Sequence, residues 1–210
     1  MAKPKTFPVD FESQRPAYFY PADQSQVTGD ILEIGPGNGE LLLWHAANDP
    51  GKKFVGIEIA LWRIRKMIRR IERESLGNVL LIRGNARILL PRYFSTPCFE
   101  RVYVLFPDPW PKSRHSHQRL LSVEFLRRLA TILKPGGDIV LASDEQPYVD
   151  WTIENVSHVP EFRLDGSPYY TGPRLIPSGD QTWFERLWRN QGKDIYYARM
   201  VRSESAVAEI

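Results

Sequence analysis

Short apolar runs alternate with longer stretches of helical periodicity over most of the chain. The runs predict buried strands at 30–35, 53–59, 79–84, 101–106, 138–143, 161–166 and 194–201. The stretches between them predict helices at 40–49, 60–76, 86–94, 117–133 and 146–158. Strands that alternate with helices are typical of parallel βαβ units, so we expect an α/β fold with an open sheet covered on both faces.

The ends of the chain lack this alternation. Residues 1–28 are rich in proline and aromatic residues without a clear period and predict an N-terminal arm. A single domain is expected from 29 to 202, with a short tail at 203–210. Inside that domain, the glycine- and proline-rich segment 166–181 predicts a loop.

Composition narrows the class of protein. The chain has 210 residues, 42% of them hydrophobic, enough for one domain with a sizeable core. Cys98 is the one cysteine, which excludes a disulfide within the chain and a zinc site built mainly from cysteines. The four histidines form no HExxH pair, so no metal is expected. No signal peptide or membrane-spanning run is apparent, and we expect a cytoplasmic protein with no membrane partner.

Basic residues concentrate in the predicted helix at 60–76. The net charge is +3 and the isoelectric point about 9.0, which is weak evidence for a nucleic-acid partner. Within this helix, Leu61, Ile64, Ile68 and Ile71 predict one buried face. The same helix carries Arg63, Arg65, Lys66, Arg69, Arg70 and Arg73. Two interpretations stay open: a solvated helix face with i,i+4 pairs, or a surface that faces RNA.

A glycine-rich turn follows the first strand and precedes a helix. Gly35, Gly37 and Gly39 let the backbone turn sharply and approach a ligand. Glu58 ends the next strand, where an acidic residue accepts hydrogen bonds from ribose hydroxyls. This arrangement fits both NAD and S-adenosylmethionine.

Two details favour the methyl donor. Glu33 stands just before the glycines, where a carboxylate opposes a pyrophosphate but suits a sulfonium and an ammonium group. The segment Lys134–Gly137 resembles the LKPGG turn of class I methyltransferases. Asn85, after the third strand, is placed either to bond an adenine edge or simply to form a turn.

The fourth strand leaves the core through a stiff corner, FPDPWPKSRH. Pro107 and Pro109 fix φ on both sides of Asp108, and a basic run follows. Strand ends of this kind carry ligands in open parallel sheets, so Asp108 is a candidate site residue. The alternative is that Asp108 caps a turn and Trp110 covers the core.

The corner resembles the signature of the bacterial tRNA (guanine-N7)-methyltransferases. The segments LEIGPGNG, GIEI, SDEQPY and TWFE also resemble elements of that family, in order from about 31 to 186. The resemblance implies a Rossmann-like class I methyltransferase fold, with an open, mostly parallel seven-stranded sheet whose last strand is antiparallel. It further implies methyl transfer from S-adenosylmethionine to N7 of guanine 46 in the tRNA variable loop.

The same resemblance implies residue roles. The methyl donor would be held by Glu33, Gly35, Gly37, Glu58 and Asn85. Asp108 would be the catalytic residue. The substrate would be contacted by Lys112, Arg114, Asp144, Thr182 and Glu185, with the run from Arg114 to Arg119 on RNA. The family usually continues RHxKRR, whereas this chain has His117 and Gln118 at two of the basic positions.

Other interpretations stay open on the sequence. The chain could be a class I methyltransferase for another RNA or a small molecule, or a non-catalytic tRNA-binding subunit of the same fold. An NAD oxidoreductase is the most distant alternative. The segment QTWFERLWR also fits a capped amphipathic helix, with Thr182 as its N-cap and Glu185 closing a capping box. The oligomeric state is not predicted.

Overall fold

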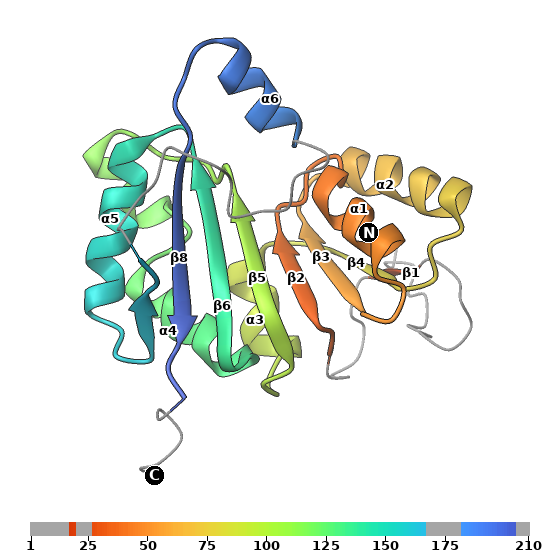
Figure 1. Ribbon diagram of the computed structural model, residues 1–210, viewed down its shortest axis with the longest axis horizontal. Helices are drawn as coiled ribbons and strands as arrows, with labels where there is room; N and C mark the ends of the chain where they lie inside the picture. Colours follow the sequence, from red (N-terminus) through yellow and green to blue (C-terminus); the bar gives the residue numbers. More distant parts are fainter. Residues whose placement is uncertain (1–16, 20–26, 167–181, 205–210) are drawn as a thin grey trace, which may run out of the picture. The chain divides into compact units, whose positions relative to one another are not determined.

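The computed structural model describes residues 17–19, 27–166 and 182–204, which group into two units, 1–96 and 97–210 (Figure 1). Most of the predicted arm and tail, and the predicted loop 166–181 apart from Gly166, lie outside these ranges. Every helix within the described ranges is too short or too polar to span a bilayer.

The first unit contains a parallel sheet in the order β1-β4-β3-β2. Every residue of β3 is buried, as expected for a parallel strand with helices on both of its faces. One strand was not predicted: β1 lies in the predicted arm and pairs with β4. The strands are β1 (Ala17–Phe19), β2 (Ile31–Ile34), β3 (Phe54–Glu58) and β4 (Val79–Arg83).

Two helices of this unit share one apolar cluster with β3 and β4. The prediction of a buried face on α2 is confirmed for Ile64 and Ile71, but Met67 also belongs to that face. Met67 packs against Gly39, where an added Cβ would lie 2.8 Å from its Cγ and Sδ atoms. Gly39 therefore lets α2 approach the glycine turn closely. The helices are α1 (Glu40–Asn48), α2 (Leu61–Glu74) and α3 (Ala86–Tyr93).

The second unit orders its strands β5-β6-β8-β7. β5 and β6 are parallel, whereas β8 is antiparallel to both of its neighbours, which confirms the predicted antiparallel last strand. The predicted Lys134–Gly137 turn is instead the first part of β6, where the register with β5 shifts. The strands are β5 (Phe99–Leu105), β6 (Leu133–Ser143), β7 (Phe162–Leu164) and β8 (Tyr196–Arg202).

The helix predicted at 117–133 was too long at its start. α4 begins at Val123 because the Ser122 hydroxyl accepts a hydrogen bond from the Phe125 N–H and caps it. A separate 3₁₀ helix, η1, precedes it and includes His117 and Gln118. The helices of this unit are η1 (Ser113–Gln118), α4 (Val123–Ile132), α5 (Gln146–Ser157) and α6 (Trp183–Asn190).

One amide joins the turn before β3 to the turn before β4. Asn78 Nδ2 lies 3.1 Å from Ala46 O, 3.2 Å from Asp49 O and 3.0 Å from Lys52 O. Two of these carbonyls lie at the end of α1 or just after it, where helix carbonyls lack intrahelical partners. The side chain of Asn78 therefore closes the C-terminal end of α1.

We expect Asn78→Asp to destabilise the protein by about 2 kcal/mol, because both N–H donors are lost and a charge faces carbonyl oxygens. Urea unfolding of the purified variant measures the change. Asn48→Ala is the control: among the described residues this exposed amide bonds Trp44 O in its own helix, and its loss should cost within about 0.5 kcal/mol. Equal stability of the two variants would contradict the role of Asn78.

Candidate functional site

The glycine turn after β2 is open on one side. Gly35, Gly37 and Gly39 have φ of 74°, 60° and 76°, in the left-handed region that favours glycine. A Cβ added at Gly35 or Gly37 would meet nothing within 4 Å. The Gly35 N–H donates to Ile57 O at 2.8 Å, which anchors the turn to β3. The backbone therefore leaves room for a ligand in front of the turn.

Glu58, at the end of β3, holds this turn through its side chain. Its Oε2 accepts from the Gly37 N–H at 3.1 Å, and its Oε1 accepts from the Ala60 N–H at 2.8 Å. Arg63, in the first turn of α2, lies 3.6 Å from the carboxylate. The predicted proximity of Glu58 to the glycine turn is therefore observed.

Glu33 lies in β2 with only 3% of its surface exposed. Its Oε2 has no hydrogen-bond partner among the described residues. Burial raises the pKa of this carboxyl to about 8; the charges of Glu40 and Glu58 add to the shift, while a backbone hydrogen bond from Leu42 opposes it. Such a carboxyl lacks a cation, and a positively charged ligand group would satisfy it. The residues here therefore fit the sulfonium and ammonium groups of S-adenosylmethionine.

Asn85 lies beside these residues and caps a helix. The Gly84 N–H donates to Glu58 O at 3.0 Å, which brings the end of β4 to the end of β3. Asn85 is exposed, and its Oδ1 accepts from the Arg87 N–H at 3.0 Å as the N-cap of α3. Its amide N–H groups stay available to donate, so the cap and the predicted bond to an adenine edge are compatible.

The proline corner of the second unit is strained at both ends. Phe106 and Trp110 have φ of 50° and 42°, values that non-glycine residues rarely adopt. Between them, Asp108 is exposed to solvent. The Phe106 N–H donates to Ala142 O at 2.8 Å, so the corner starts beside the end of β6. Strain of this kind occurs mainly at functional sites, where surrounding contacts maintain it.

Arg119 supplies one of those contacts. Its Nε donates to Pro109 O at 3.0 Å, and its guanidinium lies 5.2 Å from the ring centre of Trp151. Trp110 also packs against His115, with ring centres 5.9 Å apart. Arg119 was predicted to contact RNA as the end of the basic run, and the structure shows that its side chain also holds the corner.

The TWFE element reaches the corner through an aromatic pair. Phe184 stacks on Phe106, with ring centres 6.1 Å apart. Thr182 is the N-cap of α6, and its hydroxyl accepts from the Glu185 N–H at 3.2 Å. This element is far from the corner in the sequence, and we expected it near the corner because ligand loops of such sheets gather at one edge and because of the resemblance.

Glu185, in the first turn of α6, is fully buried. Its Oε1 accepts from Tyr197 Oη at 2.8 Å and from Arg189 Nε at 3.0 Å. Burial, followed by the charge of Glu185, raises the pKa of Tyr197 above its ordinary value. Glu185 thus anchors α6 to β8, a role that the capping-box pattern did not indicate.

Asp144 follows β6 and is held by one lysine. Lys193 Nζ lies 2.6 Å from Asp144 Oδ2 and 4.1 Å from the ring centre of Trp188. The hydrogen bond to Asp144 raises the pKa of Lys193. Asp144 therefore lies near the corner, since Phe106 bonds Ala142 two residues earlier. Lys193 and Trp188 were not singled out from the sequence.

The basic run after the corner keeps two exposed cations, Lys112 and Arg114. Arg114 Nε donates to His115 Nε2 at 3.1 Å. Within the described ranges, no group of three or more His, Cys, Asp or Glu residues is arranged to hold a metal ion.

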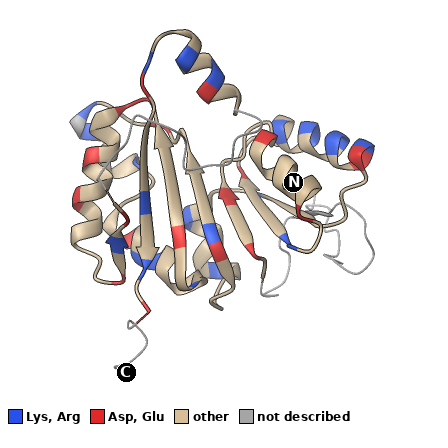
Figure 2. Ribbon diagram, in the orientation of Figure 1, with Lys and Arg blue, Asp and Glu red and all other residues tan. Residues whose placement is uncertain are grey.

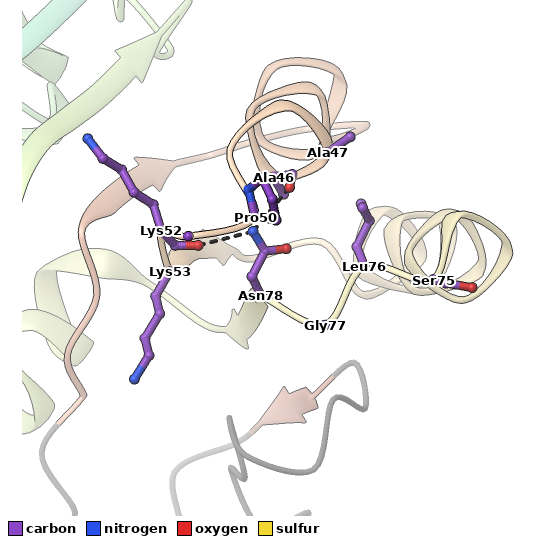
Figure 3. Close-up of a pocket in the computed structure, with 10 residues that line it drawn as sticks. Ala46, Ala47, Pro50, Lys52, Lys53, Ser75, Leu76, Gly77 and Asn78 are labelled. Atoms are coloured by element: carbon purple, nitrogen blue, oxygen red, sulfur yellow. Dashed lines mark hydrogen bonds between the residues drawn. The ribbon is translucent and has the colours of Figure 1, made fainter.

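A separate pocket of about 410 Å³ lies at the opposite end of β3 from Glu58 (Figure 3). It is lined by the turn after α1 and the turn after α2, including Lys52, Lys53 and Asn78. None of the predicted site residues lines it.

Sequence relatives cover most of the chain. Three are named tRNA (guanine-N(7)-)-methyltransferase. The protein from Chlamydia abortus is 31% identical over 82% of this chain and 75% of its own length. The protein from Chlorobium phaeobacteroides is 33% identical over 81% of this chain and 80% of its own length. The protein from Thermotoga maritima is 32% identical over 96% of this chain, but the match spans 61% of that longer relative.

Solved structures show the fold. A 16S rRNA methyltransferase, KamB, has a TM-score of 0.62 at 18% identity over 92% of this chain and 91% of its own. A methyltransferase from Pyrococcus furiosus has a TM-score of 0.58 at 17% identity, and the match covers 85% of this chain and 77% of that protein. The predicted class I methyltransferase fold is confirmed. A family model described as "Putative methyltransferase" matches residues 28–198, and the chain belongs to this methyltransferase family, Methyltransf_4.

Proposed function

We propose that this protein is a tRNA (guanine-N7)-methyltransferase that transfers a methyl group from S-adenosylmethionine to N7 of guanine 46 in the variable loop. The observation that carries the proposal is the exposed Asp108 on a corner strained at Phe106 and Trp110. Relatives that bear this enzyme name also match this protein over most of its length.

The first unit supplies the groups that would hold the donor. Glu33 offers a buried carboxyl whose ionised form a bound cationic group would stabilise, and Glu58 offers a carboxylate to ribose hydroxyls. The open backbone at Gly35 and Gly37 admits close approach, and the Asn85 amide can donate to adenine. When bound, S-adenosylmethionine supplies a methyl group already activated on a sulfonium.

The second unit supplies recognition of the base. Guanine N7 has an in-plane lone pair and no proton, so the chain needs no strong base. Asp108 can accept hydrogen bonds from the N1–H and N2–H₂ groups of guanine, which adenine does not present together. Its charge also stabilises positive charge that develops on the ring during transfer. The prolines keep this carboxylate in place, and the rest of catalysis is mostly alignment of N7 with the methyl group and the sulfur.

The remaining predicted residues would act on the tRNA around that base. Lys112 and Arg114 are exposed cations suited to phosphates. Asp144 is held by Lys193, and the Thr182–Glu185 element supports the corner through Phe184. A stacked guanine has to leave its stack to meet these groups.

The function is tested with purified protein, labelled S-adenosylmethionine and tRNA transcripts that carry guanine, 7-deazaguanine or adenine at the target position. Methyl transfer is expected to the guanine transcript alone, with 7-methylguanosine mapped by chemical cleavage at that position. Equal transfer to the 7-deazaguanine transcript would contradict N7 as the acceptor. Binding without turnover would indicate the non-catalytic subunit.

Asp108→Asn should reduce methyl transfer at saturating cofactor by about 100-fold or more, because a charged acceptor that stabilises developing charge is lost. Single-turnover assays measure the rate. Cofactor affinity and melting temperature should stay close to wild type, since Asp108 is exposed. Near-normal turnover of Asp108→Asn would instead indicate that Asp108 only caps a turn.

Glu58→Ala should weaken S-adenosylmethionine binding about tenfold or more, because the ribose hydroxyls and the Gly37 N–H both lose a charged acceptor. Isothermal titration calorimetry gives the dissociation constant. Glu72→Ala, which removes an exposed acid from α2, is the matched control and should change nothing. An unchanged constant in Glu58→Ala would remove Glu58 from the cofactor site.

Glu33→Gln should weaken cofactor binding yet raise the melting temperature of the ligand-free protein. The folded-state pKa of about 8 exceeds the ordinary 4.5, so folding takes up a proton between these values. The contribution of protonated Glu33 to the free energy of unfolding is fully present below pH 4.5. It decreases by up to about 1.4 kcal/mol per pH unit as the pH rises toward 8. The advantage of Glu33→Gln should therefore grow from pH 5 to pH 8. Parallel melting curves of the two proteins against pH would contradict this.

A further inference from the structure

One face of α2 carries an exposed basic stripe. We name it the α2 stripe: Trp62, Arg65, Lys66, Arg69 and Arg73, which recur at helical spacing on one side. The buried residues Ile64, Met67 and Ile71 lie on the opposite side and pack in the core. Figure 2 shows basic residues along α2, with acidic ones only at its C-terminal end. The stripe therefore faces away from the unit's own core.

The charges of this helix repel one another. Arg65 and Arg69, Arg69 and Arg73, and Lys66 and Arg70 are like-charged pairs at i,i+4, each of which destabilises a helix. The acidic residues of α2 are Glu72 and Glu74, and Glu74 already pairs with Arg70 at 3.6 Å and with Arg73 at 2.8 Å. A solvated helix face usually mixes both signs at this spacing, so the stripe lacks the compensation expected of one.

Three cations of α2 turn inward or sideways, and one of them, Lys66, belongs to the stripe. Arg63 pairs with Glu58 at 3.6 Å, Lys66 Nζ donates to Asn38 Oδ1 at 3.0 Å, and Arg70 donates to Asn38 O at 3.3 Å. These contacts fix α2 against the glycine turn. They also leave Arg65 and Arg69, both exposed, as the centre of the stripe.

An exposed aromatic ring begins the stripe. Trp62 is 61% exposed, and the Arg63 guanidinium lies 5.1 Å from its ring centre. Ile59, just before α2, is 65% exposed. Guanidinium groups match phosphate oxygens in pairs, and an exposed indole stacks on any nucleobase. Basic residues combined with such a ring suit a nucleic acid better than an acidic protein surface.

We propose that the α2 stripe is a second tRNA-binding surface, distinct from the run at Lys112 and Arg114, in which the arginines bind phosphates and Trp62 stacks on a base. The proposal rests on the proposed function for the identity of the partner. The stripe extends about 16 Å along α2, long enough to meet several phosphates. Phosphates would also relieve the like-charge repulsion within the helix.

The test is the salt dependence of tRNA binding by the double variant Arg65→Gln/Arg69→Gln, measured by fluorescence anisotropy with labelled tRNA. Loss of two phosphate contacts should lower the slope of log K against log salt by about 1.4–1.8. The melting temperature should stay equal or rise, since repulsion is removed, and S-adenosylmethionine affinity should not change.

Lys53→Gln/Arg92→Gln is the charge-matched control, because it removes two exposed cations of the same unit from outside α2. Its slope should change by less than about 0.5. Trp62→Ala should weaken binding about tenfold with an unchanged slope, because stacking releases no counterions. Equal salt slopes of tRNA binding in the stripe and control variants would overturn the proposal. It would also be overturned if the stripe substitutions weakened binding to anionic lipid vesicles but left the salt slope of tRNA binding unaltered.

The wild-type protein separates this proposal from the proposed function. If the wild type methylates guanine N7 in tRNA but the stripe variants bind with the wild-type slope, only the stripe assignment is wrong. If the wild type does not methylate tRNA, yet the stripe variants lower the slope as expected, the stripe stands and the enzymatic assignment fails.

Discussion

The candidate cofactor site of the first unit depends on the contacts that the Glu58 carboxylate makes. It accepts from the Gly37 and Ala60 amides and pairs with Arg63, so the glycine turn and the start of α2 are fixed by one side chain. The backbone oxygen of Glu58 accepts from Gly84, which adds the turn before Asn85. Because Glu58 is buried, these donors also satisfy a charge that would otherwise destabilise the fold.

Each unit maintains one unfavourable feature where its predicted site residues lie. In the first unit it is electrostatic: the Glu33 carboxyl is buried without a cation. In the second it is conformational: Phe106 and Trp110 hold positive φ, at a cost of roughly 1–3 kcal/mol each. Surrounding contacts, such as Arg119 on Pro109 and Phe184 on Phe106, offset the second cost. Features that reduce stability are expected where function selects them.

The sequence predicted most strands because parallel strands are buried on both faces and appear as continuous apolar runs, as in β3. It placed the start of α4 too early, because the apolar periodicity also includes residues before Ser122, the residue that caps the helix. The glycine turn and Glu58 were predicted because both belong to one local βαβ unit. The buried network of Glu185 with Tyr197 and Arg189, and the strain at Phe106, depend on tertiary contacts and backbone angles that no local pattern records.

Net charge is a poor guide to RNA binding here, because several cations are already engaged within the protein. Arg119 bonds the corner, while Arg189 and Lys193 hold Glu185 and Asp144. The run after the corner thus retains Lys112 and Arg114, with His117 and Gln118 where the tRNA methyltransferase pattern has basic residues. Affinity for a polyanion has to come from cations that remain exposed. Among the described residues such cations concentrate on α2, so a weaker run at the corner increases the share of tRNA binding that we assign to the α2 stripe.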